Sequence, residues 1–546
     1  MFQQSTRHVA SYYAHSCADR LVNRTTLEGE QDTEVLIIGA GFSGLHTALR
    51  LALAGKRVTL LEASRVAWAA SGRNGGQAIL GWSCDMPPLE AALGYERARR
   101  LWDGMRWAAR ELRDLPGRHE FDCDYRAGHL WTSVMPRRVG LLTEWQHEAS
   151  HKWGHDKLQF IPRQQLPEWV ASERYQAGLF DPEGGHLNPL KLALGLADAV
   201  ERAGGRIYEQ SKALSYGEEG EGFVVTTERG RIRAYVLVLA CNAYLDRLDP
   251  QLASCVLPVG TYQVATAPLT KDQATALLPS NVCVTDNQFV LDYFRRTPDN
   301  RLLFGGGCTY LGGMPKDIAA ATRPFLERVF PQLTGVDLEF AWGGHIDLTL
   351  KRTPDIGRRG DLYWLQGYSG HGVLPVGTYQ VATAPLTKDQ ATALLPSNVC
   401  VTDNQFVLDY FRRTPDNRLL FGGGCTYLGG MPKDIAAATR PFLERVFPQL
   451  TGVELEFAWG GHIDLTLKRT PDIGRRGELY WMQGYSGHGV LPTLAAARAV
   501  SDAILGQPDE LSLYQGLNNG SFPGGKYLAA PLEAIGKAWY RLRDSI

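Results

Sequence analysis

The sequence predicts an α/β protein that combines a Rossmann-like domain with an α+β domain built on an antiparallel sheet. The first observation is a strand, glycine turn, helix and second strand in residues 34–62. The second is a further alternation of helix-like and strand-like segments over residues 186–240, and the third is a long segment rich in β-branched residues that occurs twice. A chain of 546 residues exceeds one hydrophobic core, so two or more domains are expected.

The segment EVLIIGAGFSGLHTALRLALAGKRVTLLE, residues 34–62, is typical of a dinucleotide-binding βαβ unit. Gly39 permits the tight turn after the first strand, Gly41 lets a pyrophosphate approach the backbone, and Gly44 lets the helix pack on the strand. The N-terminus of this helix presents N–H groups to phosphates. Glu62, at the end of the second strand, is placed to accept hydrogen bonds from a ribose diol.

A second glycine-rich segment narrows the choice of dinucleotide. Residues 71–77 read SGRNGGQ, and here the chain resembles the FAD-dependent amine and amino-acid oxidases of the D-amino-acid-oxidase type, in particular the branch that oxidises gamma-glutamylputrescine. In that family the segment runs along the flavin, so the resemblance implies FAD as the cofactor. A plain glycine-rich surface loop is the alternative. The implied flavin contacts are Ser71, Arg73, Asn74, Gly75, Gly76 and Gln77.

The resemblance extends over nearly the whole chain apart from one copy of the repeated segment. Residues 186–208 predict a helix followed by the start of a strand, and three more strand-like segments follow. In the family this region lies beside the adenine near Ala213, although an ordinary strand residue explains Ala213 almost as well. The implied FAD-binding domain comprises residues 30–85, 175–255 and 460–510, the substrate domain comprises 86–174 and 256–459, and residues 511–546 form a C-terminal helical tail.

The repeated segment is a long tandem duplication. Residues 256–372, here called copy one, reappear as residues 373–489, called copy two. Repeat architectures use shorter and more divergent units, so we interpret the second copy as a recent insertion into a sheet that has one position for it. We expect copy one to begin the sheet, copy two to complete it, and the surplus strands to cause domain swapping or aggregation. The copies differ at Asp337 and Glu454, Asp361 and Glu478, and Leu365 and Met482.

The stretch GYSGHG ends each copy, but an Ala-rich helix follows only the second. Reduced flavin needs a positive environment, which backbone N–H groups at Gly487, His488 and Gly489 and the N-terminus of that helix would supply. A turn histidine with a structural role is the alternative for His488. His371 has the same neighbours and no helix after it, so copy two is predicted to be the working copy here.

The chemistry that the resemblance implies needs no acid, base or nucleophile from the protein. A hydride passes from the carbon next to the amine to flavin N5, the electrons pass to dioxygen, and the products are an aldehyde, ammonia and hydrogen peroxide. No catalytic residue is therefore assigned beyond the electrostatic role of His488. The expected substrate is gamma-glutamylputrescine or a related amine. Two alternatives stay open: an oxidase or dehydrogenase of glycine, sarcosine or D-amino acids, and a flavin-binding protein inactivated by its duplication.

Aromatic residues near the flavin are the candidate substrate contacts. A hairpin is predicted at residues 289–307, with its copy at 406–424, and in the family its strands face the flavin. Its arginines could bind the carboxylate of a glutamyl group. Core packing explains the aromatic residues equally well. Lys351 or Lys468 is a weaker candidate for oxygen activation. The candidate wall residues are Trp82, Tyr293, Phe294, Tyr410 and Phe411.

Charge and cysteine content exclude several classes of function. The 57 Lys and Arg residues balance 58 Asp and Glu residues without a long run of one sign, so no nucleic acid or membrane partner is expected. The nine scattered cysteines contain no CxxC pair, which is typical of reduced thiols in a cytoplasmic protein and gives no metal site. SGRNGGQ contains no cysteine or histidine, which favours non-covalent FAD, with Cys308 and Cys425 left as candidates for a covalent link.

Overall fold

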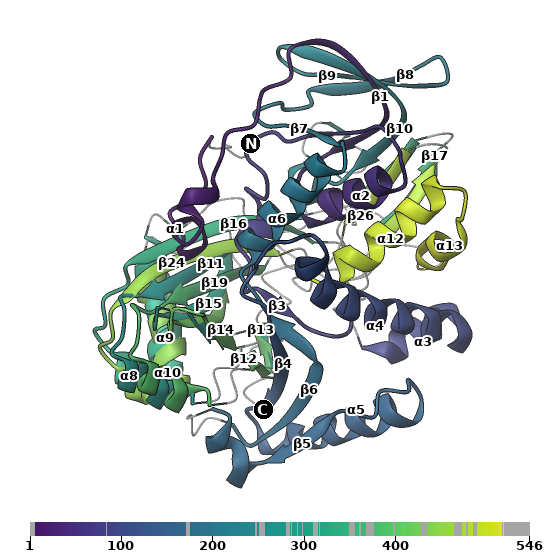
Figure 1. Cartoon of the computed structure of the whole chain (residues 1–546). Helices are drawn as coiled ribbons and strands as arrows, with labels where there is room; N and C mark the ends of the chain where they lie inside the picture. Colours follow the sequence, from purple (N-terminus) through teal and green to yellow (C-terminus); the bar gives the residue numbers. More distant parts are fainter. Residues whose placement is uncertain are drawn as a thin grey trace.

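The chain forms two large sheets with helices packed around them, as the computed structural model in Figure 1 shows. The smaller sheet has eight strands and the larger has fourteen. The structure describes residues 6–82, 85–170, 175–245, 248–249, 257–279, 284–285, 287–291, 293–297, 299–309, 315, 317–348, 355–359, 362–366, 376–396, 399–403, 405–407, 409–426, 434–463, 472–476, 479–483, 489–515 and 517.

The eight-stranded sheet has the order β25-β26-β10-β1-β2-β7, and β8 and β9 extend it from β10. The strands from β26 to β7 run parallel, as expected for a Rossmann-like sheet. Its strands are β1 (Gly29–Ile38), β2 (Val58–Leu61), β7 (Arg206–Tyr208), β8 (Ser215–Glu219), β9 (Gly222–Thr226), β10 (Gly230–Leu239), β25 (Asp472–Arg476) and β26 (Leu479–Gln483).

The fourteen-stranded sheet contains most strands of both copies. Its strands are β3 (Gln77–Ala78), β4 (Arg126–Ser133), β5 (Gln159–Pro162), β6 (Ala177–His186), β11 (Leu257–Thr266), β12 (Val284–Thr285), β14 (Tyr293–Arg296), β15 (Leu302–Thr309), β16 (Phe340–Leu348), β19 (Val376–Ala382), β20 (Cys400–Asp403), β22 (Tyr410–Arg413), β23 (Leu419–Thr426) and β24 (Leu455–Ile463). Two small sheets pair β13 (Asn287–Leu291) with β21 (Gln405–Val407), and β17 (Asp355–Arg359) with β18 (Leu362–Gln366).

The helices flank both sheets (Figure 1). Helices α2, α6 and α12 lie beside the smaller sheet, and α8 and α10 lie together at the edge of the larger one. The helices are α1 (Tyr12–His15), α2 (Phe42–Leu53), α3 (Met86–Leu93), α4 (Tyr95–Arg118), α5 (Val139–His151), α6 (Pro189–Arg202), α8 (Lys271–Leu277), α9 (Ile318–Val329), α10 (Lys388–Leu394), α11 (Ile435–Val446), α12 (Pro492–Ile504) and α13 (Asp509–Gln515).

The βαβ unit predicted from residues 34–62 is confirmed as β1, α2 and β2. The last four residues of β1 and all of β2 are buried, which explains their uninterrupted apolar sequence in a parallel sheet. α2 begins after Gly41 and ends before Gly55, whose φ of 81° is the left-handed conformation that commonly terminates a helix. The helix and strand predicted at 186–208 are likewise α6 and β7.

Two strands of the larger sheet lie in ranges that the sequence assigned to the FAD-binding domain. β3 and β6 fall within residues 30–85 and 175–255, which the sequence assigned to the FAD-binding domain, but both hydrogen-bond in the larger sheet. β6 has β4 along one edge and β3 and β5 along the other, and eight of its ten residues are buried, as in the interior of a sheet. We therefore propose that the FAD-binding part of the chain resumes after His186. Residues 518–546 of the expected helical tail lie outside the described residues.

Equivalent strands of the two copies pair with the same partner residues. On β4, Leu130 is the Cα partner of both Val284 in copy one and Val401 in copy two. On β23, Phe421 is likewise the partner of both Phe294 and Phe411. One edge of a strand hydrogen-bonds one neighbour at a time, and β4 and β23 are already paired with β6 and β19 along their other edges. The two copies therefore compete for single positions in the sheet.

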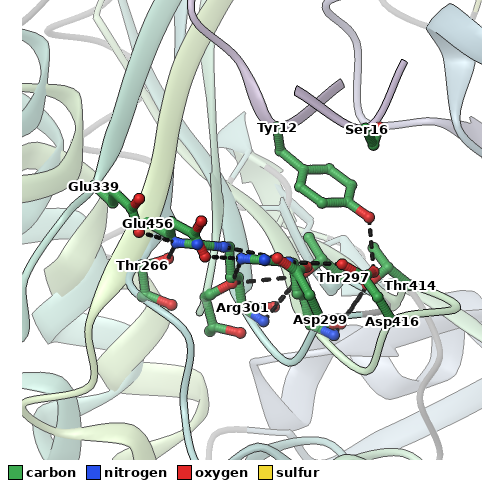
Figure 2. Close-up of polar contacts among 12 residues, drawn as sticks. Tyr12, Ser16, Thr266, Thr297, Asp299, Arg301, Glu339, Thr414, Asp416 and Glu456 are labelled. Atoms are coloured by element: carbon green, nitrogen blue, oxygen red, sulfur yellow. Dashed lines mark hydrogen bonds and ion pairs between the residues drawn. The ribbon is translucent and has the colours of Figure 1, made fainter. Parts of the chain in front are cut away.

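Equivalent side chains of the two copies also lie at the same place, as Figure 2 shows for the turns that carry Asp299 and Asp416. In copy one, Arg301 pairs with Asp299 at 2.9 Å and with Glu339. In copy two, the equivalent Arg418 pairs with Asp416 at 2.7 Å and with Glu456. Each arginine also contacts an acid of the other copy, Arg301 with Glu456 and Arg418 with Asp299. Both copies thus place the same ion-pair network in the same location, where the two arginines are buried.

The two copies differ in how they join the smaller sheet. β26 of copy two pairs in parallel with β10, and α12 follows it directly. Its copy-one equivalent, β18, pairs with β17 in a separate two-stranded sheet. Val376–Ala382 after the first GYSGHG is the strand β19, and Pro492–Ile504 after the second is the helix α12, as the sequence predicts.

Cys17, Cys123 and Cys241 are free thiols. Within the described ranges, no helix has the length and apolar character needed to cross a bilayer.

Candidate active site

The three glycines of the turn after β1 are required by close backbone packing. A Cβ at Gly39 would meet the carbonyl group of Ala240, and its φ of 108° is unfavourable for other residues. A Cβ at Gly44 would meet the carbonyl oxygen of Gly39, and one at Gly41 would lie 2.9 Å from Ser71 Oγ. Gly41, the residue before α2, has no side chain that could cap the helix. The first N–H groups of α2 therefore face residues 71–77. This arrangement fits a dinucleotide pyrophosphate.

Glu62 lies at the end of β2, beside this turn. Its carboxylate accepts hydrogen bonds from the backbone N–H groups of Ala40, at 3.0 Å, and Ser64, at 2.9 Å. Burial is the main cause that raises the pKa of Glu62 to about 7, against the lowering effect of these two donors. The Ser211 N–H donates to the Glu62 carbonyl oxygen at 2.8 Å, which brings the segment leading to Ala213 alongside. Ala213 itself is 7% exposed.

The segment 71–77, here called the flavin loop, lies between α2 and the larger sheet. Ser71 Oγ accepts the Phe42 N–H at 3.0 Å, which ties the loop to the first turn of α2. Asn74 Oδ1 accepts the Gly76 N–H at 2.8 Å, and Asn74 Nδ2 donates back to the carbonyl oxygens of Ala70 and Ser71. These local bonds fix the loop's own conformation.

Arg73 is buried within this loop and does not reach solvent. Its guanidinium donates to the carbonyl oxygens of Trp68 and Gly343, and it lies 4.1 Å from the centre of the Trp68 ring. Burial lowers the pKa of Arg73 to about 10, so it stays charged at neutral pH. Arg73 therefore supplies a fixed positive charge beside the flavin loop.

Copy two makes most of the described contacts to the flavin loop. The Trp459 indole N–H donates to the Arg73 carbonyl oxygen at 2.8 Å. Gln77 Nε2 donates to the Val401 carbonyl oxygen at 3.2 Å, and the Thr402 hydroxyl donates to Gln77 Oε1 at 3.3 Å. The indole N–H of Trp342, the copy-one equivalent of Trp459, has no hydrogen-bond partner among the described residues. The surroundings of the loop thus distinguish two otherwise equivalent tryptophans.

Tyr410 and Arg412 of β22 lie against the two glycines in the middle of the loop. A Cβ at Gly75 would meet the Tyr410 ring, and one at Gly76 would lie 3.1 Å from Arg412 Nη2. Arg412 Nη1 donates to His186 Nδ1 at 3.1 Å, while Arg412 Nε and Nη2 have no partner among the described residues. Burial lowers the pKa of Arg412 to about 10, so the guanidinium remains cationic. A buried cation with free donors favours an anionic ligand at this point.

The other predicted wall residues are dispersed. Phe294 and Phe411 are fully buried and pack with Phe421 inside the larger sheet. Trp82 is buried against Tyr514 of α13, with 5.8 Å between ring centroids. The side chain of Tyr293 lies outside the described part of the structure.

The glycine-rich stretch before α12 is described only at its end. Gly489 accepts hydrogen bonds from the Thr493 N–H at 3.2 Å and the Thr493 hydroxyl at 2.6 Å, which fixes the start of α12. Gly487, His488, Lys351, Lys468 and the side chains of Cys308 and Cys425 lie outside the described residues. No cluster of metal-ligating side chains occurs in the ranges that the structure covers.

Sequence reasoning missed Tyr13 and Gln380, which also contact the flavin loop. The Tyr13 hydroxyl lies 2.8 Å from the Asn74 carbonyl oxygen and 3.1 Å from Gln380 Oε1, and Gln380 Nε2 donates to the Tyr410 hydroxyl at 2.8 Å. No local motif marks either residue, because both reach the loop from distant parts of the chain.

Comparison with known proteins decides the family. The model of the FAD dependent oxidoreductase family called DAO matches residues 34–375 and 373–503. The chain belongs to this family. It is therefore an FAD-dependent oxidoreductase. The residues that would hold the FAD are Gly39, Gly41 and Gly44 of the turn after β1, here called the glycine cradle, together with Glu62 and the flavin loop.

Relatives of this FAD-dependent oxidoreductase cover most of its length. It is 41% identical to gamma-glutamylputrescine oxidoreductase of Escherichia coli over 370 residues, which are 67% of this chain and 86% of that protein. It is 36% identical to the probable oxidoreductase OrdL of Haemophilus influenzae over 68% of this chain and 86% of that protein. Glycine oxidase of Bacillus cereus has the same fold, with a TM-score of 0.56, 15% identity, and coverage of 90% of this chain and 100% of that one.

Proposed function

We propose that this oxidoreductase is an amine oxidase that converts gamma-glutamylputrescine, or a related amine with a carboxylate, to an aldehyde, ammonia and hydrogen peroxide. The observation that carries the proposal is Arg412, a fully buried guanidinium beside Gly76 of the flavin loop that has no carboxylate partner among the described residues. A free carboxylate on the substrate would form the charge-assisted pair that this arginine lacks. The 41% identity to gamma-glutamylputrescine oxidoreductase supports the same substrate.

The bound flavin supplies the redox step by accepting a hydride from the carbon next to the amine and passing the electrons to dioxygen. The chain's own residues bind and orient the substrate. Arg412 would fix the carboxylate end, and Tyr410, which lies on Gly75, would limit how the aliphatic chain approaches the loop. Burial of both side chains keeps water away from the arginine, which strengthens its attraction for an anion.

The test compares peroxide release from gamma-glutamylputrescine and from putrescine, which has no carboxylate. Arg412→Met should raise KM for gamma-glutamylputrescine by about 100-fold, the loss of a buried charged pair, and leave putrescine nearly unaffected. Arg413→Met changes the next residue of β22, whose guanidinium donates to Thr392, and serves as the control. Equal losses for both amines, or equal effects of both variants, would contradict a carboxylate-binding role for Arg412.

An oxidase of glycine, sarcosine or D-amino acids is the second candidate, because these substrates also carry a carboxylate. The glycine oxidase of Geobacillus kaustophilus, 26% identical over 396 residues, supports this candidate. Turnover of glycine, sarcosine and D-alanine in the same assay distinguishes the two. Peroxide from these substrates with none from gamma-glutamylputrescine would establish the second candidate.

The third candidate is a flavin-binding protein in which the duplication blocks turnover. The pairing of both copies with the same residues of β4 and β23 supports it. It predicts bound FAD that the amine does not reduce, and activity restored when residues 256–372 are deleted. We favour an active site completed by copy two, because Trp459, Val401 and Thr402 already bond the flavin loop.

A further inference from the structure

The N-terminal helix α1 extends into the candidate active site. It precedes the dinucleotide-binding unit in sequence, yet Tyr13 has no exposed surface. The Tyr13 ring packs edge-on against Trp459 of β24, with 4.8 Å between ring centroids. Its hydroxyl therefore lies at the junction of the flavin loop and the larger sheet.

The Tyr13 hydroxyl contacts both of these elements. It lies 2.8 Å from the Asn74 carbonyl oxygen of the loop and 3.1 Å from Gln380 Oε1 of β19, and it accepts a hydrogen bond from Arg295. The loop carbonyl can only accept, so the hydroxyl must donate to it. Burial raises the pKa of Tyr13 above its ordinary value, so the hydroxyl keeps its proton at physiological pH.

We propose that Tyr13 is a positioning residue that holds the flavin loop at a fixed distance from the larger sheet, because its hydroxyl donates to Asn74 of the loop and accepts from Arg295 of β14. Asn74 fixes Gly76 through its side chain, and a side-chain carbon at Gly75 would meet Tyr410, so a shift of the Asn74 carbonyl would move the glycines that face the flavin. Tyr13 acts through the loop and does not take part in the redox step.

Tyr12 provides a matched control. It is the preceding residue, it is 2% exposed, and its hydroxyl donates to Asp416 at 2.7 Å, away from the flavin loop. Figure 2 shows this hydroxyl pointing toward the turn that carries Asp416. Tyr12→Phe and Tyr13→Phe each remove one buried hydroxyl from the same helix, so a general loss of stability would affect both variants.

The experiment measures FAD binding to the apoprotein by quenching of flavin fluorescence. Tyr13→Phe should raise the Kd for FAD about fivefold to tenfold, as expected for one buried hydrogen bond, and change the shape of the bound flavin's visible absorbance. Tyr12→Phe should leave both unchanged. Equal effects of the two variants, or a wild-type Kd and spectrum for Tyr13→Phe, would overturn the proposal.

A second pair of variants tests the sheet side of the same contact and does not depend on the folding of Tyr13→Phe. Arg295→Met removes the donor on β14, and Arg296→Met makes the same change at the next residue, whose guanidinium donates to Thr275 and Asn417. Arg295→Met should weaken FAD binding at least threefold more than Arg296→Met. Similar Kd values for these two variants would contradict the bridge. FAD binding is measured without substrate, so this outcome is independent of the proposed amine.

Discussion

Trp459 and Trp342 are equivalent residues of the two copies in different hydrogen-bonding situations. The Trp459 N–H is bonded to the Arg73 carbonyl oxygen, and the buried Trp342 N–H has no partner in the part of the chain that the structure describes. Trp459→Phe should therefore lower the free energy of unfolding by about 1–2 kcal/mol and weaken FAD binding, because it leaves a loop carbonyl unpaired. Trp342→Phe should be neutral or slightly stabilising. Chemical denaturation and FAD titration of both variants check this, and the reverse order of effects would assign the loop contact to copy one.

Glu62 gives FAD binding a pH dependence. Burial raises its pKa to about 7 in the free protein, so folding favours the protonated acid and this group's contribution to stability falls as pH rises from about 4.5 to 7. Ribose hydroxyls that donate to the carboxylate favour its charged form. The Kd for FAD should therefore decrease by up to about tenfold per pH unit between pH 5.5 and 7. Titrations at several pH values measure the slope, and Glu62→Gln should abolish it. A Kd independent of pH in the wild type would contradict this role.

Local residue patterns predicted the glycine cradle after β1, but they did not predict the side-chain contacts between distant parts of the chain. Gly44 is required by the Gly39 carbonyl oxygen within the same turn, and Gly39 takes a positive φ in that turn, so a short motif records both. Tyr13 and Gln380 meet 367 positions apart in the sequence, and nothing near either residue signals the contact. Trp82 was expected as a substrate wall because it follows the flavin loop closely, but its packing against Tyr514 depends on a helix near the end of the chain.

The strands β18 and β26 allow the two copies to be followed separately. β26 is hydrogen-bonded to β10 inside the eight-stranded sheet, and β18 pairs with β17 in a two-stranded sheet. Among the described strands β18 is hydrogen-bonded to β17 alone and takes no part in the eight-stranded sheet, so amides of β18 should exchange with solvent about tenfold or more faster than those of β26. β18 contains Leu365 where β26 contains Met482, so the peptides of the two strands have distinct masses in hydrogen-exchange mass spectrometry. Equal protection would show that neither copy is preferred in the smaller sheet.

The elements that were predicted well have a strong local period or clear end signals. β1, α2 and β2 follow from apolar runs and glycines, and α12 follows from its Ala-rich sequence after Pro492. The sheet that contains β6 could not be predicted in this way, because its membership depends on pairing with β3, β4 and β5. Sequence identity between the copies also cannot decide which copy pairs with β4, since both offer the same residues to the same edge.

The duplication should lower the stability of the whole molecule. Arg301 and Arg418 are both buried and share the acids Asp299 and Glu456, so a chain with two copies holds more buried positive charge in that location than one network can satisfy. Deletion of residues 256–372 should raise the free energy of unfolding by about 3 kcal/mol, the order of one poorly compensated buried charge. Denaturant unfolding of both chains checks this prediction. An unchanged midpoint and slope would mean that the full chain accommodates both copies.

Surplus strand edges should also affect assembly. The copy that loses the competition for β4 and β23 retains unpaired edges, which favour association with a second chain. Size-exclusion chromatography with light scattering should show dimers or larger species for the full chain and fewer of them after the deletion. A monodisperse monomer of the full chain would contradict domain swapping.

The most direct test of the account is an anaerobic absorbance titration of the full-length chain with gamma-glutamylputrescine, followed by admission of air. An active site completed by copy two predicts that the bound-flavin spectrum bleaches with substrate and returns in air with release of hydrogen peroxide. The chain lacking residues 256–372 should behave in the same way. A flavin spectrum that stays unbleached in the full chain but bleaches after the deletion would contradict the account and show that the duplication blocks the site.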